Sequence, residues 1–256
     1  MRRLAGHPDP DPAPGIGPGT SAATDPPVPR DPGRDPAGRG DRVTSSRPGT
    51  PLRVGVAGRT GSGKTALIAA LCRVMADRMS VAVVTNEVAM PRDADTLRSS
   101  GVIPGERVAP VFTEPAGGGT GGEDLEANFE AVDELVSRLF PLDLVLVEAA
   151  GDDLDASFGE ELVDLRVLVL DATHGERILL GTDLGVLGAD LLVVTKADLA
   201  RREGIAPAWL EAIAHRVAGD APVIVLSLRE DPGAAEVVTW LLEQAARWRA
   251  GAPVPA

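Results

Sequence analysis

Apolar residues beyond residue 50 follow two patterns that alternate along the chain. Continuous runs rich in Val and Leu predict buried strands at residues 52–57, 81–85, 107–112, 142–147, 167–170, 191–194 and 223–226. Apolar residues at helical spacing predict helices over residues 63–78, 91–99, 123–139 and 234–250. Short apolar strands that alternate with helices are typical of parallel sheets. The pattern therefore predicts an α/β fold, with a mostly parallel sheet flanked by helices on both faces.

The first 50 residues differ in composition and have no hydrophobic periodicity. They contain 11 of the 22 prolines and 8 of the 29 glycines. Such a segment cannot bury enough apolar surface to offset the entropy lost on ordering. We therefore expect residues 1–50 to be a disordered tail and residues 51–250 to form the folded domain.

Charge and apolar content exclude several classes of protein. The formal net charge is −13, and because residues 1–50 carry 7 Arg against 6 Asp, the remainder carries about −14. Such a surface repels nucleic acid. The chain has no apolar run of ~18 residues that could span a membrane, and the single cysteine, Cys72, excludes a disulfide framework. We expect a cytoplasmic protein that binds neither nucleic acid nor membrane, with Cys72 buried in a helix.

Only two of the 25 basic residues are lysines, Lys64 and Lys196. A chain that otherwise uses arginine is expected to keep lysine where a compact ammonium is needed. Lys64 lies in a G-x-x-x-x-G-K-T sequence that ends at Thr65, between a predicted strand and a predicted helix. This pattern is a P-loop, in which Lys64 holds the β- and γ-phosphates and Thr65 binds Mg²⁺; the alternative is an ordinary glycine-rich turn. The backbone amides expected to bind phosphate lie around Gly58, Gly61, Ser62 and Gly63.

The second lysine follows the predicted strand 191–194, in the sequence Thr195-Lys196-Ala197-Asp198. This sequence resembles the [NT]-K-x-D element of GTPases, in which the aspartate accepts hydrogen bonds from two guanine nitrogens and the lysine stem packs along the base. Asp198 and Lys196 therefore predict GTP as the ligand. The alternative is a helix start with Asp198 in its first turn.

Three acidic residues lie just after predicted strands. Glu148 and Glu87 are candidates for orienting Mg²⁺ or the attacking water during phosphoryl transfer, and the alternative for both is a solvated strand end. Asp171 is expected to be structural. The three histidines share no ligand-like spacing with cysteine or acidic residues, so we expect no nickel or zinc site.

The region from Leu52 to Trp240 resembles the urease accessory protein G family, GTPases of the signal-recognition and MinD class of P-loop proteins. The resemblance rests on the P-loop segment, on the Ala82–Asn86 strand, on Leu142–Glu148 and on Ala189–Lys196. It implies a slow, partner-stimulated GTP hydrolase that assists nickel insertion into urease. The implied partners are urease accessory proteins and apo-urease. Because the family couples metal binding to dimerisation, the resemblance also makes a homodimer a candidate assembly.

The chain departs from the family at its metal motif. Where the family carries Cys-Pro-His, an ungapped count places Ala116, Gly117 and Gly118, which offer neither thiolate nor imidazole. The nucleotide motifs are kept, apart from Glu87 in place of Asp and Thr195 in place of Asn. Two alternatives follow: a GTP-switched interaction protein or degenerate paralogue that carries no metal, and a small-molecule kinase that uses ATP.

Overall fold

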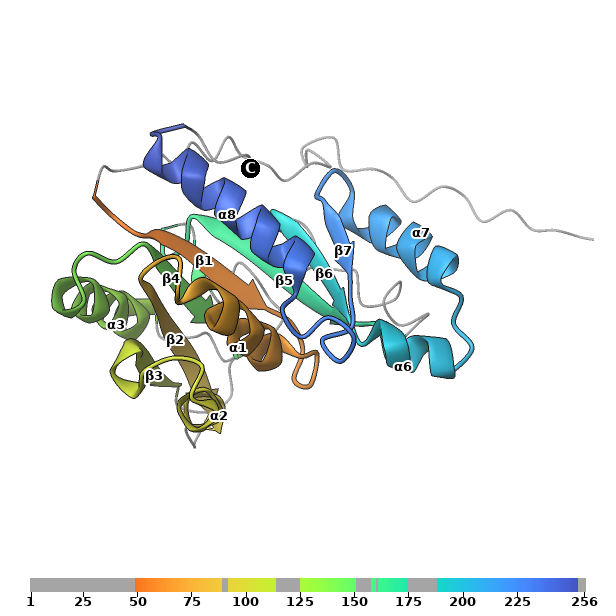
Figure 1. The fold of residues 1–256 in the computed structure, drawn as a ribbon, viewed down its shortest axis with the longest axis horizontal. Coiled ribbons are helices and arrows are strands. Elements are labelled where there is room, and N and C mark those ends of the chain that lie inside the picture. The colour runs from red at the N-terminus through yellow and green to blue at the C-terminus, as the bar shows by residue number, and fades with distance from the viewer. Residues whose placement is uncertain are drawn as a thin grey trace, which may run out of the picture. The chain divides into compact units, whose positions relative to one another are not determined.

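The computed structural model describes residues 49–88, 92–113, 125–150, 158–159, 161–174 and 188–252. Seven strands form one sheet in the order β3-β2-β4-β1-β5-β6-β7, and every neighbouring pair is parallel (Figure 1). The strands are β1 (Leu52–Ala57), β2 (Val81–Val88), β3 (Val108–Thr113), β4 (Leu144–Glu148), β5 (Leu165–Asp171), β6 (Leu191–Thr195) and β7 (Val223–Val225). The prediction of a parallel α/β fold is confirmed.

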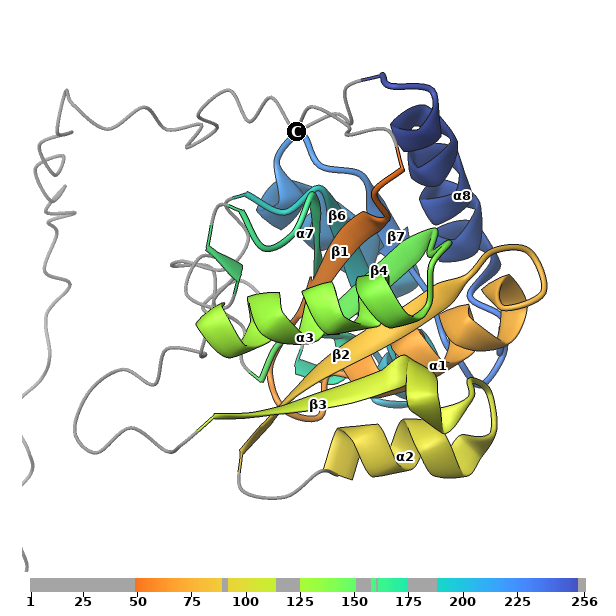
Figure 2. The same ribbon diagram turned by 90° about the vertical axis from the view of Figure 1, so that its left-hand side faces the viewer.

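Helices cover both faces of the sheet, as predicted (Figure 2). Successive strand residues point to opposite faces, so Val54 of β1 belongs to the core beneath one set of helices and Val145 of β4 to the core beneath the other. One face is covered by α1 (Lys64–Met75), α2 (Arg92–Ser100) and α8 (Ala235–Arg249). The other is covered by α3 (Leu125–Arg138), α6 (Ala197–Arg202) and α7 (Pro207–Ala218).

The strand order determines where polar residues at strand ends meet. Strand β1 lies between β4 and β5, with Val54 opposite both Leu146 and Leu165. Because all strands run the same way, the carboxyl ends of β1, β2, β4, β5 and β6 lie along one edge of the sheet. Loops at this edge are where ligands bind in open α/β sheets.

The elements match the predicted ones with a few differences. Strand β1 has the predicted bounds, α1 ends at Met75 instead of Arg78, and β2 continues to Val88. Helix α7 had no counterpart among the predicted elements, and α6 corresponds only to the alternative interpretation of Asp198 as part of a helix start. Within the described part of the chain, two single-turn 3₁₀ helices, η1 (Gly105–Arg107) and η2 (Ala172–His174), complete the fold. The predicted tail up to residue 48, the glycine-rich loop 117–122 and the predicted helix start at 123–124 lie outside the described residues.

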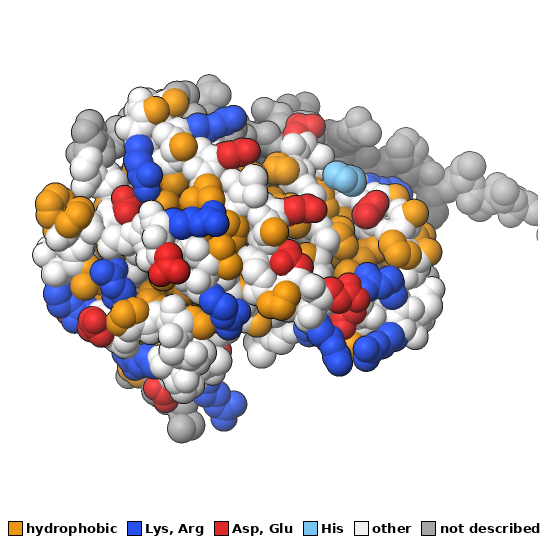
Figure 3. Space-filling view, viewed as in Figure 1, with side chains coloured by type: hydrophobic (Ala, Val, Ile, Leu, Met, Phe, Trp, Pro, Cys, Tyr) orange, Lys and Arg blue, Asp and Glu red, His pale blue; other side chains and the backbone are white. Residues whose placement is uncertain are grey.

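Acidic and basic side chains are interspersed over the face that carries α1 and α8 (Figure 3). Basic side chains gather over α6 at the right of this view. In the ranges that the structure describes, no helix is long and apolar enough to cross a membrane.

Candidate functional site

The loop between β1 and α1 has a backbone that requires glycine. Gly58 has φ of 147°, and a Cβ atom there would lie 2.3 Å from the carbonyl oxygen of Val169. Gly61 and Gly63 also have positive φ, 82° and 100°, and Gly63 is the N-cap of α1. Such conformations are strained for other residues. The loop can therefore turn sharply and direct backbone N–H groups inward, as phosphate binding requires.

Lys64, the first residue of α1, folds back over this loop. Its Nζ donates to the carbonyl oxygen of Gly58 at 2.6 Å, and the side chain is buried. Helix α1 has neither an acidic residue in its first turn nor a side-chain cap, so its positive end is available to an anion. Ser62 is buried beside Lys64, and its Oγ has no hydrogen-bond partner among the described residues. Positive charge and a spare donor thus converge at the predicted phosphate site.

The hydroxyl of Thr65 lies between two carboxylates. Its Oγ1 is 2.6 Å from Oε1 of Glu148, at the end of β4, and 3.1 Å from Oδ1 of Asp93, in the first turn of α2. Oε2 of Glu148 is buried without a hydrogen-bond partner in the described part of the chain. Magnesium prefers such hard oxygen ligands, using one or two carboxylates together with phosphate oxygens and water. The orphaned oxygen and its neighbours fit a magnesium ion.

The surroundings of Glu148 disfavour its charged form. Burial raises the pKa of its carboxyl from 4.5 to about 8. The hydrogen bond from Thr65 and the charge of Lys64 act in the opposite direction, while the negative charges of Asp93 and Glu87 raise the pKa further. A cation bound here would favour the ionised carboxylate and would therefore offset the effect of burial on the pKa.

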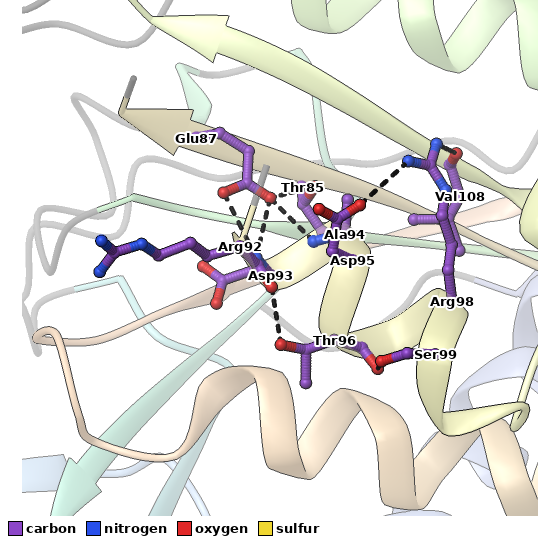
Figure 4. Close-up of polar contacts among 10 residues, drawn as sticks. All are labelled: Thr85, Glu87, Arg92, Asp93, Ala94, Asp95, Thr96, Arg98, Ser99 and Val108. Atoms are coloured by element: carbon purple, nitrogen blue, oxygen red, sulfur yellow. Dashed lines mark hydrogen bonds and ion pairs between the residues drawn. The ribbon is translucent and has the colours of Figure 1, made fainter. Parts of the chain in front are cut away.

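Glu87 holds α2 against the end of β2 (Figure 4). Its Oε1 accepts hydrogen bonds from the backbone amides of Ala94, at 2.8 Å, and Asp93, at 3.1 Å, and from the hydroxyl of Thr85, at 3.1 Å. A carboxylate at this end of a helix satisfies amides that lack helical partners. The observed contacts of Glu87 are therefore those of a helix cap, which places Asp93 next to Thr65. The predicted role of Glu87 in orienting Mg²⁺ or water stays a prediction.

Two residues at this edge were missed by the sequence analysis. Asp93 looks in sequence like any acidic residue in a helical first turn, which the helix dipole favours. Asn128 of α3 exchanges two side-chain hydrogen bonds with Asn86, of 2.9 and 2.8 Å, and Asn86 also donates to the carbonyl oxygen of Glu148 at 3.1 Å. This buried amide pair links β2, β4 and α3 next to Glu148.

The second predicted motif is bonded to the P-loop. Oγ1 of Thr195, the last residue of β6, donates to the carbonyl oxygen of Ser62 at 2.6 Å. Nζ of Lys196 donates to the carbonyl oxygen of Gly61 at 2.6 Å and pairs with Oδ2 of Asp171 at the same distance. The structure therefore brings together the two motifs that the sequence separates by more than 130 residues. Asp171, which was expected to be structural, contacts one of the predicted ligand-binding residues.

Asp198 lies in the first turn of α6, at a pocket of about 370 Å³. Its Oδ1 accepts a hydrogen bond of 2.7 Å from Oγ of Ser227, which lowers the pKa of the carboxyl below its ordinary value. Asp198 starts a helix, as the alternative interpretation expected, and it also lines a pocket, while its predicted role in guanine binding stays a prediction. The pocket is lined by Asp198, Arg201, Arg202, Arg229 and Glu230.

No group of three or more His, Cys, Asp or Glu side chains that could hold a metal ion occurs within the described ranges. Cys72 is buried in α1 as predicted, and burial raises the pKa of its thiol to about 12. His215 lies exposed on α7. The positions of the family's metal motif, residues 116–118, lie outside the described residues.

The sequence of this chain is similar to the sequences of known proteins. Residues 52–225 match the family described as "CobW/HypB/UreG, nucleotide-binding domain". The urease accessory protein UreG of Mycobacterium tuberculosis H37Rv is 44% identical over 200 residues, which cover 78% of this chain and 89% of the relative. The urease accessory protein UreG of Mycobacteroides abscessus is 42% identical over 195 residues, covering 76% and 85%.

Solved structures share the fold at lower identity. The hydrogenase maturation factor HypB of Archaeoglobus fulgidus has a TM-score of 0.60 and 21% identity, covering 76% of this chain and 90% of that one. HypB of Helicobacter pylori, solved in complex with nickel, has a TM-score of 0.61 and 18% identity, covering 80% and 91%. The family match spans most of the chain and includes both motifs at the sheet edge. The chain therefore belongs to the CobW/HypB/UreG family of P-loop nucleotide-binding proteins and, within it, to the UreG urease accessory proteins.

Proposed function

We propose that this chain binds GTP and hydrolyses it slowly, stimulated by a partner, to assist nickel-dependent maturation of urease in the cytoplasm. One observation carries the GTP assignment: Thr195 and Lys196 donate directly to the P-loop backbone. The phosphate motif and the base motif thus form one continuous surface, as a single bound nucleotide requires. The resemblance in sequence to UreG proteins supports the link to urease.

The phosphate end of this site would work by positioning and charge. Loop amides between Gly58 and Gly63 would bind the phosphates, with Lys64 on the β/γ side. Thr65 would hold Mg²⁺, with Glu148 facing it; bound magnesium supplies positive charge that neutralises the phosphate oxygens. Glu148 or Glu87 would then orient the attacking water, since phosphoryl transfer depends mainly on alignment and electrostatic stabilisation.

The base end would select guanine. The carboxylate of Asp198 is only an acceptor when ionised, so it matches the two donors on the guanine edge and not the single amino group of adenine. Ser227 holds this carboxylate in place at 2.7 Å. The planar guanidinium groups of Arg201, Arg202 and Arg229 in the pocket wall offer faces on which a purine can stack.

Titration calorimetry with GTP, ATP and XTP, each with Mg²⁺, tests this assignment. The wild type should bind GTP more tightly than ATP. Asp198→Asn should weaken GTP binding by about 5- to 100-fold, because it replaces a charged acceptor by an amide, and should favour XTP. Asp77→Asn, at an exposed position after α1, serves as the control and should change none of these affinities. Equal affinity of the wild type for ATP and GTP would refute the assignment and favour an ATP-dependent kinase.

The proposed partners are urease accessory proteins, apo-urease and a second copy of the chain. The proposed domain spans residues 51–250, with residues 1–50 as a separate tail.

A second candidate is a GTP-switched interaction protein that carries no metal. The observation that favours it is the sequence Ala116-Gly117-Gly118 at the family's metal motif. Nickel titration with and without GTP tests whether the chain itself carries the metal, and the residues at this motif predict that it does not.

A further inference from the structure

Lys196 is held in place both at its backbone and at the end of its side chain. Its backbone is left-handed, with φ of 59°, an uncommon conformation for a residue other than glycine, and it caps α6. At the other end, Nζ lies 2.6 Å from the carbonyl oxygen of Gly61 and 2.6 Å from Oδ2 of Asp171. The lysine stem is thus held across the gap between α6 and the P-loop.

Asp171 is itself fixed. Its Oδ1 accepts hydrogen bonds from the backbone amide of Thr173 at 2.9 Å and from the hydroxyl of Thr173 at 2.7 Å. Oδ2 is thereby turned toward Lys196. Burial would raise the pKa of Asp171, but the hydrogen bonds from Lys196 and Thr173 outweigh it, and the pKa lies below its ordinary value. The aspartate remains an ionised partner at neutral pH.

The sheet also fixes the position of Asp171 relative to Lys196, which directly follows Thr195. Asp171 ends β5, Thr195 ends β6, and these two residues are register partners in adjacent parallel strands. The 3₁₀ helix η2, which begins directly after Asp171, packs against α6. The position of the aspartate relative to the lysine is therefore set by the sheet.

We propose that Asp171 is a positioning residue for guanine binding, which holds the stem of Lys196 against the P-loop as a preformed wall of the base site. This inference rests on the GTP-binding function proposed above. A free lysine side chain has several rotatable bonds, and ordering it on binding would reduce affinity. Asp171 orders it during folding instead. The aspartate then acts through Lys196 on the base and has no direct effect on the phosphates.

The opposite end of β5 offers a matched control. Asp164, one residue before β5, is 4% exposed and pairs with Arg53, with distances of 2.8 Å to the backbone amide and 3.1 Å to the guanidinium. Asp164→Asn breaks a comparable, partly buried ion pair at the amino end of β5, far from the carboxyl ends of the strands. It should reduce stability without changing nucleotide binding.

The experiment compares the binding of Mg·GTP and of inorganic tripolyphosphate with steady-state hydrolysis of GTP. Asp171→Asn should raise the Kd and KM for GTP by about tenfold, with kcat changed less than about twofold. Its affinity for tripolyphosphate should equal that of the wild type. Asp171→Glu should recover part of the GTP affinity, and Thr173→Val, which keeps the ion pair, should give a smaller loss in the same direction.

A double-mutant cycle separates positioning from a general loss of structure. Asp171→Asn should add nothing to the GTP affinity lost in Lys196→Ala, because both changes act through the same side chain. Additive losses, a lowered kcat at unchanged KM, or an equal loss of tripolyphosphate binding would overturn the inference. So would an effect of Asp164→Asn on GTP affinity equal to that of Asp171→Asn. A wild type that prefers ATP would instead refute the proposed function, and the wild-type titration alone decides that.

Discussion

Replacing Glu148 with glutamine should change how the stability of the ligand-free protein depends on pH. In the folded protein the pKa of this carboxyl is about 8, against 4.5 for an ordinary glutamate. The folded state therefore keeps a proton that the unfolded chain releases. The stability associated with that proton is fully present below about pH 4.5 and is lost as the pH rises to about 8.

The size of this effect follows from the two pKa values. One pKa unit corresponds to about 1.4 kcal/mol, so a pKa raised from 4.5 to about 8 corresponds to a loss of roughly 5 kcal/mol across this range. Glutamine can still accept the hydrogen bond from Thr65 and cannot ionise. Glu148→Gln should therefore lie within about 1 kcal/mol of the wild type near pH 5 and exceed it by several kcal/mol near pH 8.5.

Urea denaturation of both proteins at half-unit steps from pH 5 to 8.5 measures this difference, with Glu130→Gln at an exposed position of α3 as the control. A second assay uses the nucleotide. Binding of Mg·GTP at pH 7 should release close to one proton, because the bound cation favours the ionised carboxylate. Calorimetry in two buffers of different ionisation enthalpy detects that proton. Parallel pH profiles for wild type and Glu148→Gln would refute the reasoning.

Three further predictions concern other parts of the chain. Asn128→Ala should lower the free energy of unfolding by about 1–3 kcal/mol, measured by urea denaturation, because it leaves the buried amide of Asn86 without its partner; an unchanged midpoint would argue against the amide pair. Deleting residues 1–48 should leave the thermal midpoint and GTP affinity nearly unchanged, whereas a fall of more than a few degrees in differential scanning calorimetry would mean that this segment docks on the domain. The unmodified protein should show neither micromolar Ni²⁺ binding nor a nickel-dependent dimer in size-exclusion chromatography with GTP and Mg²⁺. Ala116→Cys combined with Gly118→His should restore metal binding, and a nickel-dependent dimer of the wild type would contradict this prediction.

Sequence alone was sufficient for features whose cause is local. The P-loop motif occupies eight consecutive residues, Gly58–Thr65, and its three glycines all have positive φ values. All seven strands follow from apolar runs, because strands covered on both faces must be apolar throughout. Helix α7 also carried local signals, Pro207 at its start and buried Leu210 and Ile213 at helical spacing. It could have been predicted, whereas the six-residue α6 is too short to show a period.

The contacts of the site required the tertiary structure. Thr65 meets Asp93 across 28 residues and Glu148 across 83, and Lys196 meets Gly61 across 135. Hydrophobic periodicity identifies strands but does not specify their order, and it is the position of β1 between β4 and β5 that brings these groups to one edge. The raised pKa of Glu148 has the same origin, because its burial and its charged neighbours come from several different elements. Sequence therefore determined which residues could bind a nucleotide, and strand order determined which side chains surround them.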